Sequence, residues 1–142
     1  MQPEDENISR VHGRWGENVA AEFLRRGGYE ILERNSRPVK RDSRLEIDIV
    51  ARHRKTDTLV FIEVKQHSFF SPYARRMRSV GKDKLHNLKI ACNIWRLRKK
   101  WQGAYRFDII EIYGRPGEDE PIIDHIPQVE LFPRKGRFVK WN

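Results

Sequence analysis

The sequence predicts an α/β domain with a mixed sheet, built in the order helix, three strands, helix and two strands. Two stretches, about 9–26 and 82–101, carry apolar residues at helical spacing, and shorter stretches alternate polar and apolar residues as half-buried strands do. A strand, a helix and another strand in succession imply a right-handed crossover and a parallel pair. At 142 residues the chain fits one domain, which we place at 1–132, followed by a basic and loosely ordered tail at 133–142.

The first helix is expected to end at the glycine pair after residue 26, because glycine favours the conformation that follows a helix. Its apolar arc consists of Trp15, Val19, Ala20, Phe23 and Leu24. Glu17 lies at the edge of this arc, and the helical wheel alone indicates a boundary residue. Gly13 and Gly16 each cost about 1 kcal/mol relative to alanine inside a helix, so we expect this helix to pack closely against a neighbour.

The strands are expected at 29–34, in the stretches LEIDIVA and TLVFIEVK, and at 105–113 and 122–126. The connection from Ser68 to Gly81 is expected to be a long loop. The second helix is expected to turn one set of side chains inward, Leu85, Leu88, Ala91, Cys92 and Trp95, and another outward, Lys84, Arg98, Lys99 and Lys100. The lone cysteine is therefore expected to be a packed thiol.

Acidic side chains recur on the two strands that precede the long loop. Glu46 and Asp48 are two residues apart and therefore share one face of their strand. The same spacing puts Glu63 and Lys65 on one face of the next strand, and a turn at 53–57 would make the two faces coincide. Such a cluster of carboxylates and a lysine suits Mg²⁺ or Mn²⁺ and a phosphate substrate. The alternative is a surface hairpin whose charges pair across strands.

Basic residues are in excess and are concentrated in one segment. The formal net charge is +9 at pH 7, with a pI near 10.0. Between Lys65 and Trp101 there are eleven Lys or Arg residues and one acid, which is the footprint of a protein that binds a polyanion. Aromatic and basic residues interleave there, as in surfaces that stack on bases and hold phosphates: Phe69, Phe70, Tyr73, Arg75, Arg76 and Arg78. For the aromatic residues, a solvated loop is the alternative.

Nothing in the sequence predicts a membrane protein or an exported one. No apolar run approaches the ~20 residues of a membrane span, and no long apolar face flanks the basic segment. The first residues have neither a signal-peptide nor a transit-peptide composition. We therefore expect a cytoplasmic protein without a membrane partner.

Five stretches in order carry a family resemblance: GRWGENVAAEFLRRGGYEILERNSR, EIDIVA, LVFIEVK, RFDIIEI and IIDHIPQVELF. They span most of residues 13–132, and the ordered set is far more specific than the EVK triplet alone. With them the chain resembles the PD-(D/E)xK nuclease superfamily, and more narrowly the bacterial YraN-type family, which is similar to archaeal Holliday junction resolvases. The resemblance implies a restriction endonuclease-like core with the element order given above.

The resemblance also implies a metal-dependent nuclease site. It makes Asp48 and Glu63 the metal-binding carboxylates, with the backbone carbonyl of Val64 as a further ligand. Lys65 becomes the lysine of the motif. The implied reaction is phosphodiester hydrolysis, in which Mg²⁺ or Mn²⁺ stabilises charge on the phosphate and lowers the pKa of the attacking water.

Further residues match the family or depart from it. Glu17 matches an acid that resolvase-like members carry on the first helix, which makes it the fourth catalytic residue. Glu46 and Gln66 are secondary candidates. The family usually has glycine where this chain has Leu45, and an arginine commonly follows the EVK motif by two residues, where His67 stands here. His67 could replace that arginine as a phosphate donor only when protonated.

Three functions follow from these observations. The first is a metal-dependent endonuclease acting on branched or otherwise structured DNA, which the intact carboxylates and lysine favour. The second is a nucleic-acid-binding module that keeps the fold without turnover, and the third is an interaction protein with an acidic partner. Two-fold symmetric substrates would favour a homodimer. The residues expected to bind nucleic acid are Arg75, Arg76, Arg78, Lys82, Lys84, Lys99 and Lys100.

Overall fold

The computed structural model describes residues 3–69 and 81–132. The elements are α1 (Pro3–Arg26), β1 (Tyr29–Ser36), β2 (Ile47–His53), β3 (Thr58–His67), α3 (Lys82–Lys99), β4 (Tyr105–Tyr113) and β5 (Ile122–Ile126). This order confirms the expected fold class. The expected basic tail and the arginines of the long loop, Arg75, Arg76 and Arg78, lie outside the described residues. Within the described ranges, no helix combines the length and the apolar character needed to cross a membrane.

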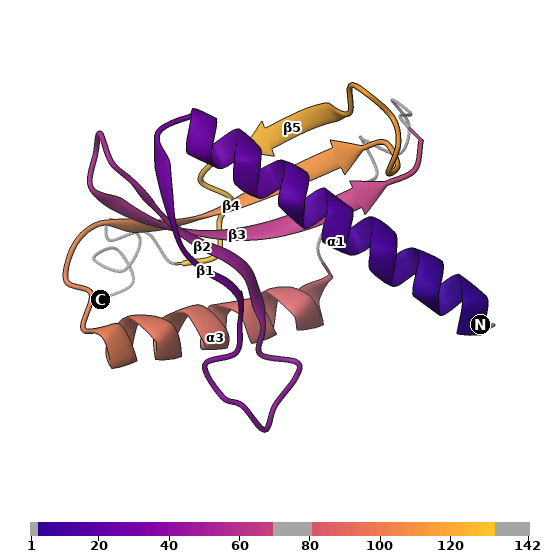
Figure 1. The fold of residues 1–142 in the computed structure, drawn as a ribbon. Helices are drawn as coiled ribbons and strands as arrows, with labels where there is room; N and C mark the ends of the chain where they lie inside the picture. Colours follow the sequence, from indigo (N-terminus) through magenta and orange to yellow (C-terminus); the bar gives the residue numbers. More distant parts are fainter. Residues whose placement is uncertain (1–2, 70–80, 133–142) are drawn as a thin grey trace.

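The five strands form one sheet in the order β1-β2-β3-β4-β5. The pair β3 and β4 is parallel, as the crossover through α3 predicts, and the other three neighbouring pairs are antiparallel. Helix α1 covers one face of the sheet and α3 lies on the other, so the molecule has three layers (Figure 1). The connection between β1 and β2 extends beyond the sheet on the side of α3 (Figure 1).

Both helices differ from their expected bounds at one end. Helix α1 begins at Pro3 rather than near residue 9, and its first turn contains Glu4, Asp5 and Glu6. Carboxylates in this position stabilise a helix because they face the positive end of its dipole. Helix α3 ends at Lys99, because Lys100 adopts the left-handed conformation, with φ 55°, and its N–H caps the last turn.

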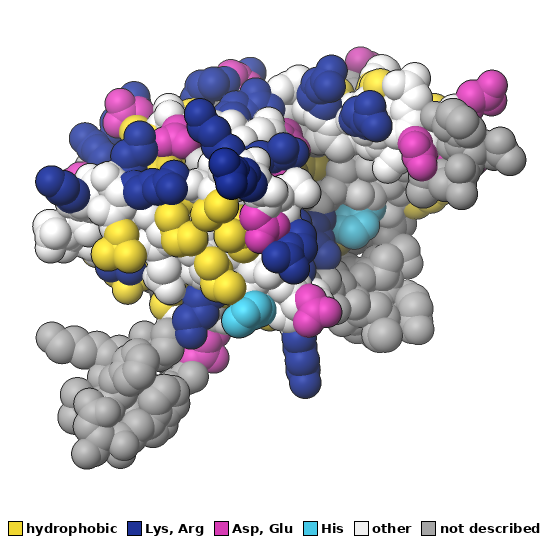
Figure 2. Space-filling model, turned by 90° about the horizontal axis from the view of Figure 1, so that it is seen from below, with side chains coloured by type: hydrophobic (Ala, Val, Ile, Leu, Met, Phe, Trp, Pro, Cys, Tyr) yellow, Lys and Arg dark blue, Asp and Glu magenta, His cyan; other side chains and the backbone are white. Residues whose placement is uncertain are grey.

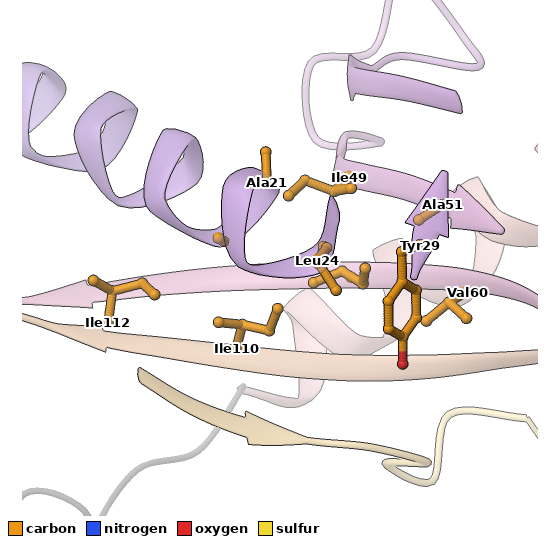
Figure 3. Close-up of a cluster of buried hydrophobic side chains, with 10 residues drawn as sticks. Ala21, Leu24, Tyr29, Ile49, Ala51, Val60, Ile110 and Ile112 are labelled. Atoms are coloured by element: carbon orange, nitrogen blue, oxygen red, sulfur yellow. The ribbon is translucent and has the colours of Figure 1, made fainter. Parts of the chain in front are cut away.

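Two apolar cores fix the helices to the sheet. On the α1 side, Ala20, Ala21 and Leu24 pack against apolar side chains of the central strands, which Figure 3 shows as Ile49, Ala51, Val60, Ile110 and Ile112. On the α3 side, Cys92 and other helix residues pack on Phe61 and Phe107. Cys92 is the expected packed thiol, and burial raises its pKa. The predicted arc of α1 was wrong at one position, because Phe23 is 36% exposed while Ala21 is buried.

The two glycines inside α1 have different surroundings. A Cβ atom on Gly16 would lie 3.0 Å from Cβ of Gln66 on β3, so this glycine permits the expected close packing of helix on sheet. A Cβ atom on Gly13 would meet nothing within 4 Å. The packing expected at Gly13 was therefore wrong, because the helix has left the sheet at that point.

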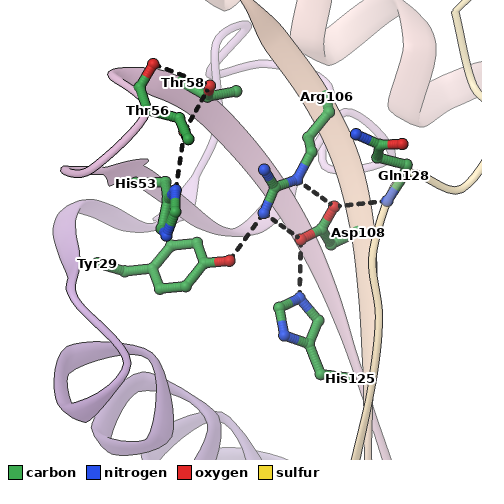
Figure 4. A network of polar contacts seen from close by, with 8 residues as sticks. All are labelled: Tyr29, His53, Thr56, Thr58, Arg106, Asp108, His125 and Gln128. Carbon is green, nitrogen blue, oxygen red and sulfur yellow. Dashed lines mark hydrogen bonds and ion pairs between the residues drawn. The ribbon is translucent and has the colours of Figure 1, made fainter.

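A polar network holds the end of the sheet where α1 leads into β1 (Figure 4). Its centre is the fully buried carboxylate of Asp108, which accepts hydrogen bonds from Arg106 Nε at 3.0 Å and from the backbone N–H of Gln128 at 2.9 Å. His125 Nε2 lies 2.8 Å from its other oxygen, and Arg106 also donates to the Tyr29 hydroxyl at 2.7 Å. These hydrogen bonds and the positive charge of Arg106 hold the pKa of Asp108 below its ordinary value, against the opposing effect of burial. Three separate segments of the chain are thereby joined: the start of β1, β4, and the stretch from β5 to Gln128.

Candidate active site

The strands β2 and β3 separate at one end, and two acidic side chains face each other there. The pairing of the two strands ends at Ile49 opposite Ile62, while β3 continues to His67. Asp48 and Glu63 are the next residues on each strand. Asp48 Oδ2 accepts a hydrogen bond of 2.8 Å from the backbone N–H of Val64, a group that would otherwise need a partner strand. The opening of the strands therefore places the two carboxylates together.

Of the two acids, Glu63 is the one whose ionised form is less well compensated by its surroundings. It is 6% exposed, its Oε1 atom has no hydrogen-bond partner within the described structure, and its Oε2 atom lies 3.4 Å from Lys84 Nζ of α3. Burial, followed by the negative charge of Asp48, raises the pKa of Glu63 to about 8, although Lys84 opposes the shift. Burial likewise raises the pKa of Asp48, against the hydrogen bonds from Glu63 and from the Val64 N–H. The pair thus favours a bound proton or cation.

Glu17 belongs to the same electrostatic cluster although it comes from α1. Its side chain is 19% exposed, and its Oε1 atom lies 3.9 Å from Arg34 Nη2 of β1. Burial raises its pKa to about 7, and the negative charge of Asp48 contributes to the shift, while Asn35 and Arg34 oppose it. Glu17 is therefore a half-buried acid whose pKa responds to the charge of Asp48 on β2.

Lys65 follows Glu63 by two residues on β3, which puts the two side chains on one face of the sheet. In the register of the parallel pair, Lys65 stands beside Glu111 of β4, a fully buried acid. Glu111 accepts a hydrogen bond of 2.9 Å from the Tyr113 hydroxyl and lies 3.2 Å from His67 Nε2. The His67 ring also stacks on Tyr113 at 4.9 Å between centroids. This face therefore continues past the EVK motif into a second polar cluster.

Sequence reasoning missed one residue here, Glu111, and one contact of a residue that it did name, Lys84. Glu111 occurs in a strand that reads as apolar, and only its register beside Lys65 connects it with the site. Lys84 was expected to face outward among nucleic-acid-binding residues, and it is exposed, but it also reaches Glu63. The available signal was the position of Lys84 in the first turn of the crossover helix that follows the EVK strand.

The secondary candidates are engaged in other contacts. Glu46 forms an ion pair with Arg37, with Oε2 and Nε 3.0 Å apart. Gln66 packs on Gly16 and donates a hydrogen bond of 2.6 Å to the carbonyl of Gly114, so its amide fixes the end of β4. Leu45, which stands where the family usually has glycine, is buried in the core on the α3 side.

Metal binding by the predicted ligands remains an expectation. Within residues 3–69 and 81–132, no three His, Cys, Asp or Glu side chains lie close enough to hold a metal ion between them. The donors that remain are the carboxylates of Asp48 and Glu63 and the predicted backbone carbonyl of Val64. The buried Oε1 atom of Glu63 has no hydrogen-bond partner among the described residues, so this oxygen is chemically suited to bind a cation.

Basic side chains are spread over the face seen from below in Figure 2, which is the side of α3 in Figure 1. Lys82 and Lys84 stand in the first turn of α3, Lys99 in its last turn, and Lys100 caps it. Lys99 lies 3.5 Å from Glu33, so part of its charge is paired within the protein. These lysines are the described part of the predicted nucleic-acid surface.

Comparison with known proteins places this arrangement in a family. The model of "Uncharacterised protein family UPF0102" matches residues 16–112. A UPF0102 protein of Syntrophotalea carbinolica is 38% identical over 117 residues, which are 81% of this chain and 87% of the relative. A UPF0102 protein of a Parafrankia species is 42% identical over 113 residues, 75% of this chain and 85% of the relative. A third, from Clostridium kluyveri, is 38% identical over 112 residues, 78% and 86% of the two chains.

Proposed function

The chain belongs to the UPF0102 family, as the YraN-type resemblance predicted, and we propose that it is a divalent-metal-dependent endonuclease for branched or otherwise structured DNA. The observation that carries the proposal is the buried pair of Asp48 and Glu63 with raised pKa values at the open ends of two strands. Lys65 on the same face and Glu17 nearby complete the residues that the resemblance to the nuclease superfamily implies. Perturbed pKa values of this kind are common at functional sites.

A divalent ion fits the donors of this site. Two carboxylates and one carbonyl are hard oxygen ligands, which suit Mg²⁺ or Mn²⁺ and leave further positions for water and phosphate oxygens. When bound, the ion supplies the positive charge that offsets the charge of a scissile phosphate. Asp48 and Glu63 hold it, and the hydrogen bond from the Val64 N–H fixes the orientation of Asp48.

The remaining residues have separate tasks in this proposal. Lys65 lies on the face of Glu63 and presents an ammonium group to the phosphate or to the attacking water. Lys84 keeps Glu63 oriented through their contact of 3.4 Å. Glu17, with a pKa of about 7, exchanges a proton readily at neutral pH and can therefore accept one from the attacking water at its carboxylate.

The test is a cleavage assay on labelled duplex, single-stranded, flap and four-way-junction DNA with Mg²⁺ or Mn²⁺. We expect cleavage by the wild type, and a loss of at least about a hundredfold in Asp48→Asn, Glu63→Gln and Lys65→Ala, because each removes a transition-state contact. Glu30→Gln, which removes one exposed carboxylate from β1, is the matched control and should cleave normally. DNA affinity in EDTA should hardly change in any variant, since phosphate contacts come mainly from the basic residues.

A nucleic-acid-binding module without turnover is the second candidate. Its support comes from the positions that depart from the family pattern, Leu45 and His67, and from Gln66 beside them. All three side chains make contacts within the protein fold, which leaves them less available for catalysis. Absence of cleavage on every substrate with both metals, together with salt-dependent DNA binding, would establish this function in place of the nuclease. Binding of an acidic protein that weakens with salt, without any DNA binding, would instead favour an interaction protein with an acidic partner.

A further inference from the structure

A groove of about 550 Å³ runs between the N-terminal half of α1 and the connection from β1 to β2. The side chains that line it and matter here are Arg10, Arg14 and Arg37 and the carboxylates of Glu17 and Glu46, with Gly13 between them. None of its arginines was among the residues expected to bind nucleic acid. Glu17 is one of its lining residues, so the groove reaches the candidate active site.

The residues of the α1 wall follow one face of the helix. Arg10, Gly13, Arg14 and Glu17 have the spacing i, i+3, i+4 and i+7, which aligns side chains along one side of a helix. At a rise of 1.5 Å per residue, this track is about 10 Å long. Two guanidinium groups thus precede the candidate catalytic acid along a single line.

The charges along the groove are unequally compensated. Across the groove from α1, Arg37 is paired with Glu46 at 3.0 Å. At the inner end, Glu17 has Arg34 within 3.9 Å. Arg10 and Arg14 are exposed and make no hydrogen bond or ion pair within the part of the chain that the structure describes. Arg10 and Arg14 can therefore bind an anion. A chain of phosphates bound there would continue along the groove toward Glu17.

Gly13 keeps the groove open. It costs about 1 kcal/mol in a helix relative to alanine, and it has no packing role, because a Cβ atom there would meet nothing within 4 Å. Gly16, one turn later, instead permits close packing on Gln66. Because Gly13 lines the groove, a side chain at position 13 would project into it.

We propose that this groove binds the sugar-phosphate backbone of an unpaired nucleic-acid strand and leads it past Arg10 and Arg14 to Glu17. A groove of about 550 Å³ can hold a short length of one sugar-phosphate backbone but cannot enclose a duplex. Among the described residues, no aromatic side chain lines the groove, so the proposed contacts are to phosphates rather than to bases. The proposal deepens the proposed nuclease function, on which it rests, because it assigns an unpaired segment of structured DNA to a specific part of the protein.

The test measures binding without metal, so that it does not depend on cleavage. A fluorescent single-stranded oligonucleotide and a duplex of the same sequence are titrated in EDTA at several salt concentrations. The double variant Arg10→Ala/Arg14→Ala is compared with Arg25→Ala/Arg26→Ala, which removes the same charge from exposed positions on the same helix. Losing two phosphate contacts should make the slope of log K against log [salt] shallower by about 1.4 for the single strand. Over a fourfold rise in salt, the affinity of the variant should therefore fall about sevenfold less than that of the wild type. The control should keep the wild-type slope, and duplex binding should change less than single-strand binding.

A second variant tests the groove without a change of charge. Gly13→Leu fills the groove and should weaken single-strand binding at least about fivefold, while the melting temperature does not fall because leucine is the better helix former. Equal losses in the two double variants, or equal losses for single strand and duplex, would overturn the groove proposal. So would normal single-strand binding by a folded Gly13→Leu variant. Each of these results is independent of whether the wild type cleaves DNA with metal, which is the test of the nuclease itself.

Discussion

At the scale of single residues, the candidate site is assembled from groups that are unfavourable to bury. Glu63 and Asp48 lose hydration at the open strand ends, and the negative charge of Asp48 further raises the free energy of ionised Glu63. A core of apolar residues at these positions would be more stable in the absence of a ligand. The arrangement is therefore one that lowers stability in exchange for a preformed anionic site, as functional sites commonly do.

The raised pKa values predict how stability changes with pH. Glu17 and Glu63 titrate near 4.5 in the unfolded chain but at about 7 and about 8 in the folded protein, so the folded state holds these protons more tightly. Between these values the free energy of unfolding should fall as pH rises, because only the unfolded chain ionises without penalty. Urea unfolding of metal-free protein at pH 5 and pH 8 measures this difference. Glu63→Gln should reduce the fall, whereas Glu30→Gln should leave it unchanged; an unchanged fall in Glu63→Gln contradicts the assignment.

At the scale of elements, α1 has two functions along its length. Its C-terminal half packs on the sheet through Ala20, Ala21 and Leu24, while its N-terminal half extends past the sheet and forms one wall of the groove (Figure 1). Gly16 marks the position of closest approach to β3, and Gly13 lies one turn beyond it. The helix thus connects the core with the candidate site through Glu17.

Alanine at the two glycines should separate these functions. Gly13→Ala should raise the free energy of unfolding by about 1 kcal/mol, because the backbone gains helix propensity and the new methyl group meets nothing. Gly16→Ala should gain less or lose stability, since its Cβ would approach Gln66 to 3.0 Å, and Gly16→Leu should lose about 1–3 kcal/mol. Chemical denaturation of the three variants measures the order. Equal gains at both positions would show that Gly16 does not limit the packing.

The sequence predicted the elements better than it predicted their partners. The alternation in LEIDIVA and TLVFIEVK located β2 and β3, and the helical spacing of Leu88, Cys92 and Trp95 located the buried side of α3. Periodicity gives the face of an element but not the residue opposite, so it could not show that Lys84 reaches Glu63 or that Glu111 stands beside Lys65. Asp108 was missed for the same reason, because its partners come from distant segments.

At the scale of the whole molecule, a bound ion would couple the site to global stability. An ion that binds only the folded state at about ten times its Kd adds about 1.4 kcal/mol, or a few degrees in Tm for a domain of this size. The gain is expected at pH 8, near the pKa of Glu63, where the ion can displace its proton, and should shrink at pH 5, where both Glu63 and Glu17 hold protons.

Thermal unfolding with and without millimolar Mn²⁺ measures this coupling. The wild type and the Glu30→Gln control should melt a few degrees higher with Mn²⁺ at pH 8, and Asp48→Asn and Glu63→Gln should not respond. A shift of equal size in the wild type and in both site variants would mean that the ion binds elsewhere on the protein.

The parallel pairing of β3 with β4 also bears on the order in which the chain acquires its structure. Asp48 and Glu63 come from a local antiparallel hairpin, which closes quickly and leaves the ribosome before the crossover helix. Asp108 lies on β4 and can be buried only after His125 and Gln128, near the end of the described chain, have been synthesised. A nascent chain would thus contain both acids of the hairpin before Asp108 can join β4 to the segment that follows β5. The hairpin with the two acids forms first and the hydrogen bonds of Asp108 form later. Nascent chains are therefore expected to expose the two acids while the sheet is still incomplete.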